Sequence, residues 1–283
     1  QETPTVACLA DGGFVTVWSG NGSGDTWGIF GRRYDGSGVA QGGEFLINSE
    51  TRRTQQSPAL AASPDGGFLV AWQSHGDQDG DASGIYAQRY DAAGARVGGE
   101  VLVNTTTAGA QKRPAIGVRT DGEYTIAWQG DGQDGSGFGI LAQRFTAAGQ
   151  PLGGEWLVNT TTDGDQKLPS VAYNDHRGRV ISWSGKGPGD GNGVFVREYD
   201  ILGVAVGDEL LVNTTPEGSQ GFVSLAAIGE GYAAAWSGRG EGDLRGVFSW
   251  RLASSLVPMA LLDNGDPGYA ESGTGWSDGS GGQ

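Results

Sequence analysis

Four short apolar runs separated by glycine-rich turns make up the stretch from Pro58 to Asn104: Pro58-Ala-Leu-Ala-Ala62, Asp65-Gly-Gly-Phe-Leu-Val-Ala-Trp72, Ile85-Tyr-Ala-Gln-Arg-Tyr-Asp91 and Gly98-Gly-Glu-Val-Leu-Val-Asn104. The same pattern is written about five times along the 283 residues. Self-similarity at such a period is typical of architectures in which each repeat is one supersecondary unit. The repeat therefore predicts the fold before any single side chain is considered.

Tryptophan sets the register of the repeat. One tryptophan per copy recurs at spacings of 54, 56, 55 and 53 residues: Trp18, Trp72, Trp128, Trp183 and Trp236. A glutamine opens each copy (Gln1, Gln55, Gln111, Gln166, Gln220), and an asparagine closes the first four (Asn48, Asn104, Asn159, Asn213). These columns divide the chain into copies at residues 1–54, 55–110, 111–165, 166–219 and 220–262.

Each copy is predicted to hold four strands. The first two flank an Asp-Gly turn such as Asp65-Gly66, which is a hairpin signal between apolar runs. The third alternates with a period of two, as in residues 28–34, and the fourth ends at the asparagine. No stretch shows the period of an amphipathic helix.

Four strands in a unit of roughly 55 residues indicate a β-propeller blade. A single blade leaves both faces bare, so neighbouring blades must stack. We predict an all-β propeller of five four-stranded blades over residues 1–262. A fragment of a larger ring and a stacked array of sheets remain alternatives. Residues 263–283 are poor in apolar side chains and are predicted to be an extended tail, either a linker or the truncated start of a following module.

The composition limits the classes of partner. The net charge of −15 repels nucleic acid and anionic lipid. No stretch approaches the roughly 18–20 apolar residues of a membrane span. Because Cys8 is the single cysteine, the chain has no internal disulfide framework. Cys8 lies in the first apolar run and is predicted to be a small buried apolar residue. Glycine, at 54 residues, falls at fixed turn positions inside the repeats rather than in low-complexity tracts.

The repeat resembles one found in very large secreted bacterial proteins, beside calcium-binding adhesin or haemolysin-type modules. The matching residues are Asp65-Gly-Gly-Phe68, Trp72, Gln88-Arg-Tyr-Asp91 and Glu100 through Asn104-Thr-Thr. The tail from Asp263 resembles the start of the C-terminal domain of golvesin and xanthan-lyase-like proteins. The two resemblances imply an extracellular, multidomain parent chain that acts on or near polysaccharide.

Two loops carry alternating acids of the kind that calcium uses as oxygen ligands. They supply the candidate metal ligands Asp77, Asp79, Asp81, Asp131 and Asp134. Calcium is the cofactor that these loops predict, with solvated acidic turns as the alternative. The terminal glutamate of an EF-hand loop is absent.

Catalytic motifs are missing from the sequence. The acids recur once per copy at turn positions such as Asp11 and Asp65, whereas a catalytic carboxylate pair is expected to break the repeat. No nucleophile elbow, phosphate loop or His/Cys metal set can be assembled. The sequence therefore predicts that the chain is not an enzyme.

Aromatic side chains outside the main column are candidates for stacking on sugars. They are Trp27, Trp156 and Trp250. The five-fold tryptophan column is instead expected to pack between blades. The sequons Asn104-Thr-Thr, Asn159-Thr-Thr and Asn213-Thr-Thr recur at one position, which favours a hydrogen-bonding role at a strand end over glycosylation.

Together these patterns predict a non-catalytic extracellular interaction or spacer module of a larger secreted or cell-surface protein, stabilised by calcium. The alternative is a carbohydrate-binding propeller that targets a polysaccharide-active enzyme. The expected partners are extracellular polysaccharide or a cell-surface protein.

Overall fold

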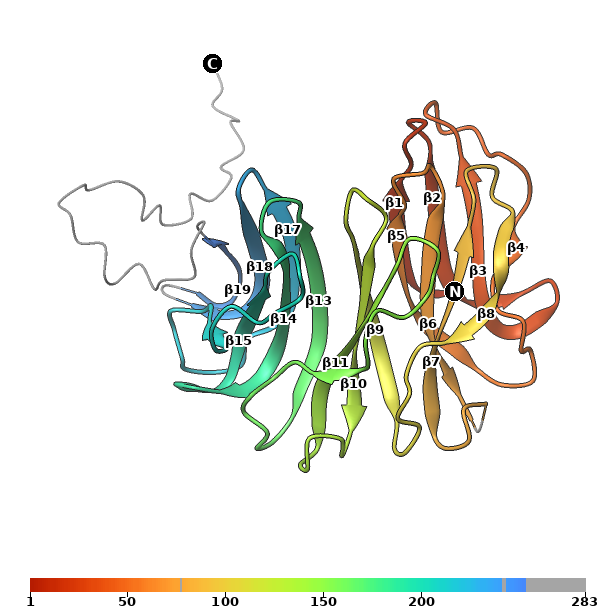
Figure 1. Cartoon of the computed structure of the whole chain (residues 1–283). Helices are drawn as coiled ribbons and strands as arrows, with labels where there is room; N and C mark the ends of the chain where they lie inside the picture. The colour runs from red at the N-terminus through yellow and green to blue at the C-terminus, as the bar shows by residue number, and fades with distance from the viewer. Residues whose placement is uncertain (77, 241–242, 253–283) are drawn as a thin grey trace, which may run out of the picture.

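The computed structural model describes residues 1–76, 78–240 and 243–252, which form strands and no helix. The first four copies each make one four-stranded antiparallel sheet in chain order (Figure 1). The strands of copies 1 and 2 are β1 (Glu2–Cys8), β2 (Phe14–Gly22), β3 (Asp25–Tyr34), β4 (Phe45–Leu46), β5 (Gln55–Ala62), β6 (Phe68–His75), β7 (Ser83–Tyr90) and β8 (Arg96–Leu102). None of the described segments is a helix able to cross a membrane.

The strands of copies 3 and 4 are β9 (Gln111–Val118), β10 (Tyr124–Asp131), β11 (Phe138–Phe145), β12 (Trp156–Leu157), β13 (Gln166–Asn174), β14 (Gly178–Gly187), β15 (Asp190–Tyr199) and β16 (Leu210–Leu211). Copy 5 forms a three-stranded sheet of β17 (Gly221–Ile228), β18 (Gly231–Gly240) and β19 (Asp243–Leu252). The fourth strand expected for copy 5 and the tail at 263–283 lie outside the described residues.

The hairpin between the first two strands forms as the Asp-Gly signal predicts. In copy 2 the Gly67 N–H donates to the Asp65 carboxylate at 3.1 Å, and Gly66 takes a φ of 87° that a β-carbon would disfavour. The turn fixes the register of the strands that follow, so that Trp72 pairs with Tyr86 on the third strand.

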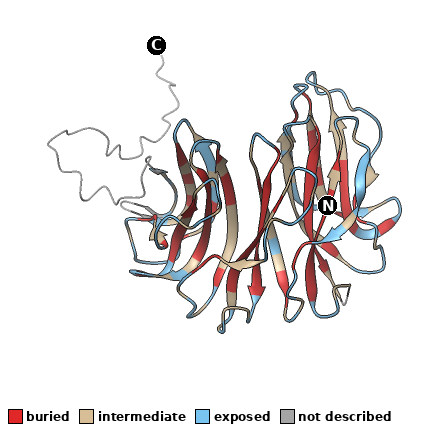
Figure 2. Ribbon diagram, viewed as in Figure 1, coloured by how far each residue is buried: buried red, intermediate tan, exposed pale blue. Residues whose placement is uncertain are grey.

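Consecutive sheets pack face to face, and the first strands of successive copies are neighbours (Figure 1). The core consists of four apolar layers, one at each junction from copies 1/2 to copies 4/5. Figure 2 shows the buried residues running through the strands of these sheets. The side chains of Trp72, Trp128 and Trp183 are wholly buried there, which confirms the packing role expected for the tryptophan column.

A bulge interrupts the pairing of the first and second strands at the same point in every copy. The bulged residue has a φ between 47° and 57°, although no copy places a glycine there; the five residues are Thr3, Ser57, Arg113, Leu168 and Phe222. Bulges of this kind re-aim a side chain and twist the strand. The sequence analysis did not anticipate it.

In copies 1 to 4 a buried polar network holds the loop that follows the second strand. In copy 4 the Asn213 side chain accepts from the Val194 N–H at 2.7 Å and donates to the Asp190 carboxylate at 2.8 Å. Asn48, Asn104 and Asn159 make the same two bonds: each accepts from an isoleucine N–H of the third strand and donates to the loop aspartate, which is Asp25, Asp79 or Asp134. The hydrogen-bonding role predicted for the asparagine column is confirmed.

Candidate functional site

A cleft lies between copies 4 and 5, at the end of the blades where the first strands begin. It has a volume of about 350 Å³. We name it the C-terminal cleft and define it by the residues that line it: Asp165, Lys167, Leu168, Ser184, Gly185, Asn192, Ser219, Gln220, Gly221, Phe222, Ser237 and Gly238.

The cleft opens because of a change in one repeat column. The residue after the opening glutamine is long and polar in copies 1 to 4 (Glu2, Gln56, Lys112, Lys167), and it is Gly221 in copy 5. The neighbouring position after the tryptophan is a small serine in both blades, Ser184 and Ser237. Short side chains at these positions leave space that larger ones fill elsewhere.

Phe222 stands at the mouth of the cleft. It is the bulged residue of β17, with a φ of 54°, and 71% of its surface is exposed. The bulge therefore turns a large aromatic ring outward, although burying such a ring typically yields about 1.5–3 kcal/mol. The sequence does carry a signal for it, an aromatic residue at a position that is Thr, Ser, Arg or Leu in the other copies, but Phe222 was not among the predicted site residues.

Two polar atoms in the lining are buried without a hydrogen-bond partner. They are the Ser184 hydroxyl oxygen and the Gln220 side-chain carbonyl oxygen. In copies 2 to 4 the carbonyl of the opening glutamine accepts from the network asparagine of the preceding copy, but Gln220 has no such bond. Buried polar atoms are nearly always satisfied by protein, water or ligand, so each of these two oxygens lacks a partner of the kind that such atoms ordinarily have.

One ion pair borders the cleft. The Lys167 ammonium lies 2.5 Å from the Asp165 carboxylate, and it also lies 5.3 Å from the centre of the Phe138 ring. The hydrogen bond from Lys167 holds the pKa of the Asp165 carboxyl below its ordinary value. Asp165 is the one carboxylate among the described residues that line the cleft.

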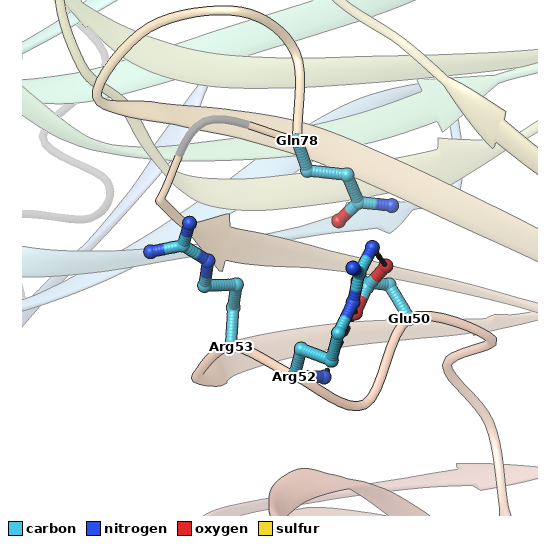
Figure 3. Close-up of a pocket in the computed structure, with 4 residues that line it drawn as sticks. All are labelled: Glu50, Arg52, Arg53 and Gln78. Carbon is cyan, nitrogen blue, oxygen red and sulfur yellow. Dashed lines mark hydrogen bonds and ion pairs between the residues drawn. The ribbon is translucent and has the colours of Figure 1, made fainter.

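A second hollow lies between copies 1 and 2, with a volume of about 650 Å³ (Figure 3). We name it the N-terminal groove; its lining residues are Glu50, Arg52, Arg53 and Gln78. The bond from Arg52 lowers the pKa of the Glu50 carboxyl to about 2. Gln78 is fixed across the groove because it accepts from Ser74 at 2.6 Å and donates to Glu100 at 2.7 Å.

The candidate metal ligands have other partners in the structure. Asp79 and Asp134 accept from the asparagines of the buried network, and Asp81 accepts from the Gly109 N–H at 2.8 Å. Asp131 is exposed, and Asp77 lies outside the described residues. Within residues 1–76, 78–240 and 243–252, no three His, Cys, Asp or Glu side chains gather as a metal ion would require. Calcium binding stays a prediction.

The three candidate tryptophans lie in different copies and are not brought together. Trp27 is 38% exposed at the start of β3. Trp156 donates to the Tyr199 hydroxyl at 3.1 Å and packs under Arg179. Trp250 packs against the layer between copies 4 and 5. Of the three, only Trp27 is exposed enough to stack on a ligand as the sequence predicted.

Two buried carboxylates break the repeat at the opposite end of the blades. Glu123 replaces a glycine and pairs with Arg144 at 2.8 Å, and Glu198 replaces an arginine and lies 3.4 Å from Arg177. The sequence analysis counted no singular acid pair, so these two are an addition to it. Neither carboxylate lines either of the hollows described above.

Comparison with known proteins identifies the architecture. No family model and no curated protein matches the sequence. Among solved structures, an arabinobiose complex of Penicillium chrysogenum α-L-arabinanase is 13% identical with a TM-score of 0.58, over 88% of this chain and 76% of that chain. The endo-arabinase of Bacteroides thetaiotaomicron is 12% identical with a TM-score of 0.53, over 89% and 93% of the two chains.

The α-L-arabinofuranosidase of Lactobacillus brevis is likewise 12% identical, with a TM-score of 0.50, over 89% of this chain and 90% of that chain. Likeness at these identities shows the fold, and it confirms the predicted all-β propeller.

The prediction that the chain is not an enzyme is contradicted by the same comparison. The matched structures are named as enzymes that act on glycans. The prediction rested on the once-per-copy recurrence of the acids and on the absence of known catalytic motifs, and the same fold is shared by proteins named as enzymes. Repetition in the sequence is therefore no argument against catalysis in this fold.

Proposed function

We propose that this protein binds a carbohydrate chain in the C-terminal cleft. The observation that carries the proposal is the pairing of an outward-turned aromatic ring with buried, unsatisfied polar atoms in one concave site. Ligand sites are typically concave surfaces with a few placed polar groups. The likeness to glycan-active propellers supports the same class of ligand.

Each part of the cleft has a role in this proposal. The Phe222 ring offers an apolar face to the C–H groups of a sugar ring. Ser184 and Gln220 offer an oxygen each to the sugar hydroxyls, which relieves the cost of leaving those atoms unpaired. Lys167 and Asp165 add a charged donor and acceptor at the rim.

The remaining predictions from the sequence belong to the same proposal. An extracellular setting, a larger parent chain and a polysaccharide partner are consistent with a carbohydrate-binding propeller. The matched structures named for arabinan-active enzymes make arabinan and its oligosaccharides the first probes.

The decisive variant is Phe222→Ala. We expect a roughly tenfold loss of affinity, or about 1.4 kcal/mol, because the stacking surface is removed. Affinity electrophoresis in polysaccharide gels and calorimetry with oligosaccharides measure it. Trp27→Ala is the matched control because it removes an exposed aromatic from copy 1, away from the cleft.

Equal affinity of the Phe222→Ala variant and the unmodified chain for every bound glycan contradicts the cleft as the site. Selective loss in the Trp27→Ala variant moves the site to copy 1. Release of reducing ends in the same incubations reports whether the bound glycan is also cleaved.

A further inference from the structure

The three junctions among copies 1 to 4 repeat two polar contacts. An arginine of one copy donates to a turn carbonyl of the next at 2.7 Å: Arg33 to Ala92, Arg89 to Ala148 and Arg144 to Leu202. A glutamate of the next copy accepts, also at 2.7 Å, from the backbone N–H that follows the network asparagine: Glu100 from Ser49, Glu155 from Thr105 and Glu209 from Thr160.

The apolar part of the junction repeats as well. The forward face of a blade presents one β-branched residue of the third strand, which is wholly buried in copies 1 to 4: Ile29, Ile85, Ile140 and Val194. The backward face of the next blade presents a first-strand residue that packs into the same layer: Leu60, Ile116, Val171 and Leu225. At each junction, a third-strand residue of one blade therefore packs in the same apolar layer as a first-strand residue of the next blade; we call these two repeat positions slots.

The forward face of copy 5 carries these groups without a cover. Val247 occupies the slot of Ile29 and Val194, and 80% of its surface is exposed. Arg251 occupies the slot of Arg33 and Arg144 and is also exposed. Among the described residues no ion pair or hydrogen bond of Arg251 is present.

The backward face of copy 1 is its counterpart. Val6 fills the slot of Leu60 and is 61% exposed. Glu44 fills the slot of Glu100 and Glu209 and is exposed, whereas Glu209 is 4% exposed. Trp18 is half-buried, although its equivalents in copies 2 to 4 are wholly buried. The first and fifth sheets are not packed on each other as neighbouring sheets are.

We propose that the forward face of copy 5 binds the backward face of copy 1 of a second molecule. The occupant is a second copy of this chain because, among the described residues, the two faces carry the apolar slots and the arginine and turn that join copies 1 to 4 to one another. Val247 would meet Val6, and Arg251 would donate to the turn at Gly36 and Ser37. Such a contact is head to tail, so molecules add in series unless the ends meet.

Cys8 reports on this contact in the unmodified protein. It is the only cysteine, and it lies two residues beyond Val6 on the same face of β1. It is exposed, so the buried position expected from the sequence is wrong, because no blade covers this face of copy 1. We expect its alkylation rate to fall as protein concentration rises through the association range. Sedimentation velocity over the same concentrations should show dimers and longer species.

Single charged variants distinguish head-to-tail from symmetric association. Val6→Asp leaves only the forward face intact, and Val247→Asp leaves only the backward face intact. We expect each variant alone to be monomeric, and an equimolar mixture to form a one-to-one dimer that grows no further. Val204→Asp is the control, because Val204 is also 61% exposed but lies in a turn of copy 4.

Several results would overturn the proposal. Monomeric unmodified protein at high concentration, with unchanged Cys8 reactivity, would show that the faces do not bind a second copy. Dimers of the Val6→Asp variant alone would show a symmetric contact between two forward faces. Equal association of the unmodified chain and both face variants would place the contact elsewhere. The glycan-binding proposal is independent of all these outcomes.

Discussion

Arg179 shows, at the level of one residue, how the fold accommodates a charged side chain at a position that is aromatic in the other copies. Its slot is aromatic in the other copies, where the rings of Phe14, Phe68 and Tyr124 stack on a third-strand ring at 4.6–4.9 Å. The guanidinium takes the same position over Tyr199, at 4.8 Å from its ring centre. A planar cation on an aromatic face replaces ring stacking, so the charge is accommodated although the residue is 1% exposed.

Glu198, another exception, makes stability depend on pH. Burial raises the pKa of its carboxyl, and Arg177 offsets only part of that effect. Because the folded-state pKa is raised, the protonated carboxyl leaves the free energy of unfolding at its full value below the unfolded pKa of about 4.3. As pH rises through the folded-state pKa, the buried carboxyl must ionise, and this stability is lost. We therefore expect Glu198→Gln to raise the urea midpoint at pH 7 and to change it little at pH 4.

The control for that experiment is Glu217→Gln. Its carboxylate side chain is 72% exposed and lies 3.4 Å from Arg239, so the midpoint should stay nearly constant at both pH values. A Glu198→Gln variant that is less stable than the unmodified protein at pH 7 would show that the pair with Arg177 outweighs the cost of burial.

At the level of elements, each strand is determined by its own local sequence, whereas the junctions between blades are stabilised by a recurring glutamate. We call this glutamate, which accepts from backbone N–H groups of the preceding blade, the clamp. The fourth strands β4, β12 and β16 each pair over only two residues, so the position of β12 and β16 also depends on the glutamate of the same copy that binds the preceding blade. Glu209 binds the backbone N–H groups of Thr160 and Thr161, and also the Thr161 hydroxyl.

Removing this clamp tests the junction between copies 3 and 4. We expect Glu209→Ala to lower the free energy of unfolding by about 2 kcal/mol, because charge-assisted bonds are lost and two N–H groups lose their acceptor. Urea unfolding in dilute solution measures it. Glu44→Ala is the matched control, since the same slot in copy 1 has no preceding blade; equal losses in both variants would contradict the clamp.

At the level of the whole molecule, the calcium prediction remains to be tested by thermal unfolding. If an acidic loop binds calcium only in the folded state, saturation at a hundred times the dissociation constant adds about 2.7 kcal/mol. The midpoint in calcium should then exceed that in EDTA, reversibly. Asp81→Ala should abolish the difference. An unchanged midpoint would identify the loops as hydrogen-bonded turns, in line with the bonds of Asp79 and Asp134.

The propeller, its blade register and its tryptophan core could be predicted from the sequence because they depend on local periodicity. An alternating run makes a strand, an Asp-Gly pair makes a hairpin, and bare faces require stacking. Each of these patterns lies within one repeat of about 55 residues, and each recurs along the five copies. The asparagine column was predictable for the same reason, since its partners recur with it.

The candidate site was decided only by the tertiary structure. The C-terminal cleft depends on Gly221 and Ser184, which lie on different blades, and on a bulge that turns Phe222 outward. The acids selected as metal ligands, such as Asp134, instead accept bonds from asparagines some 25 residues away. Sequence spacing does not predict contacts of this kind between distant residues. They are determined by how the blades pack on one another and by which faces have no neighbouring blade.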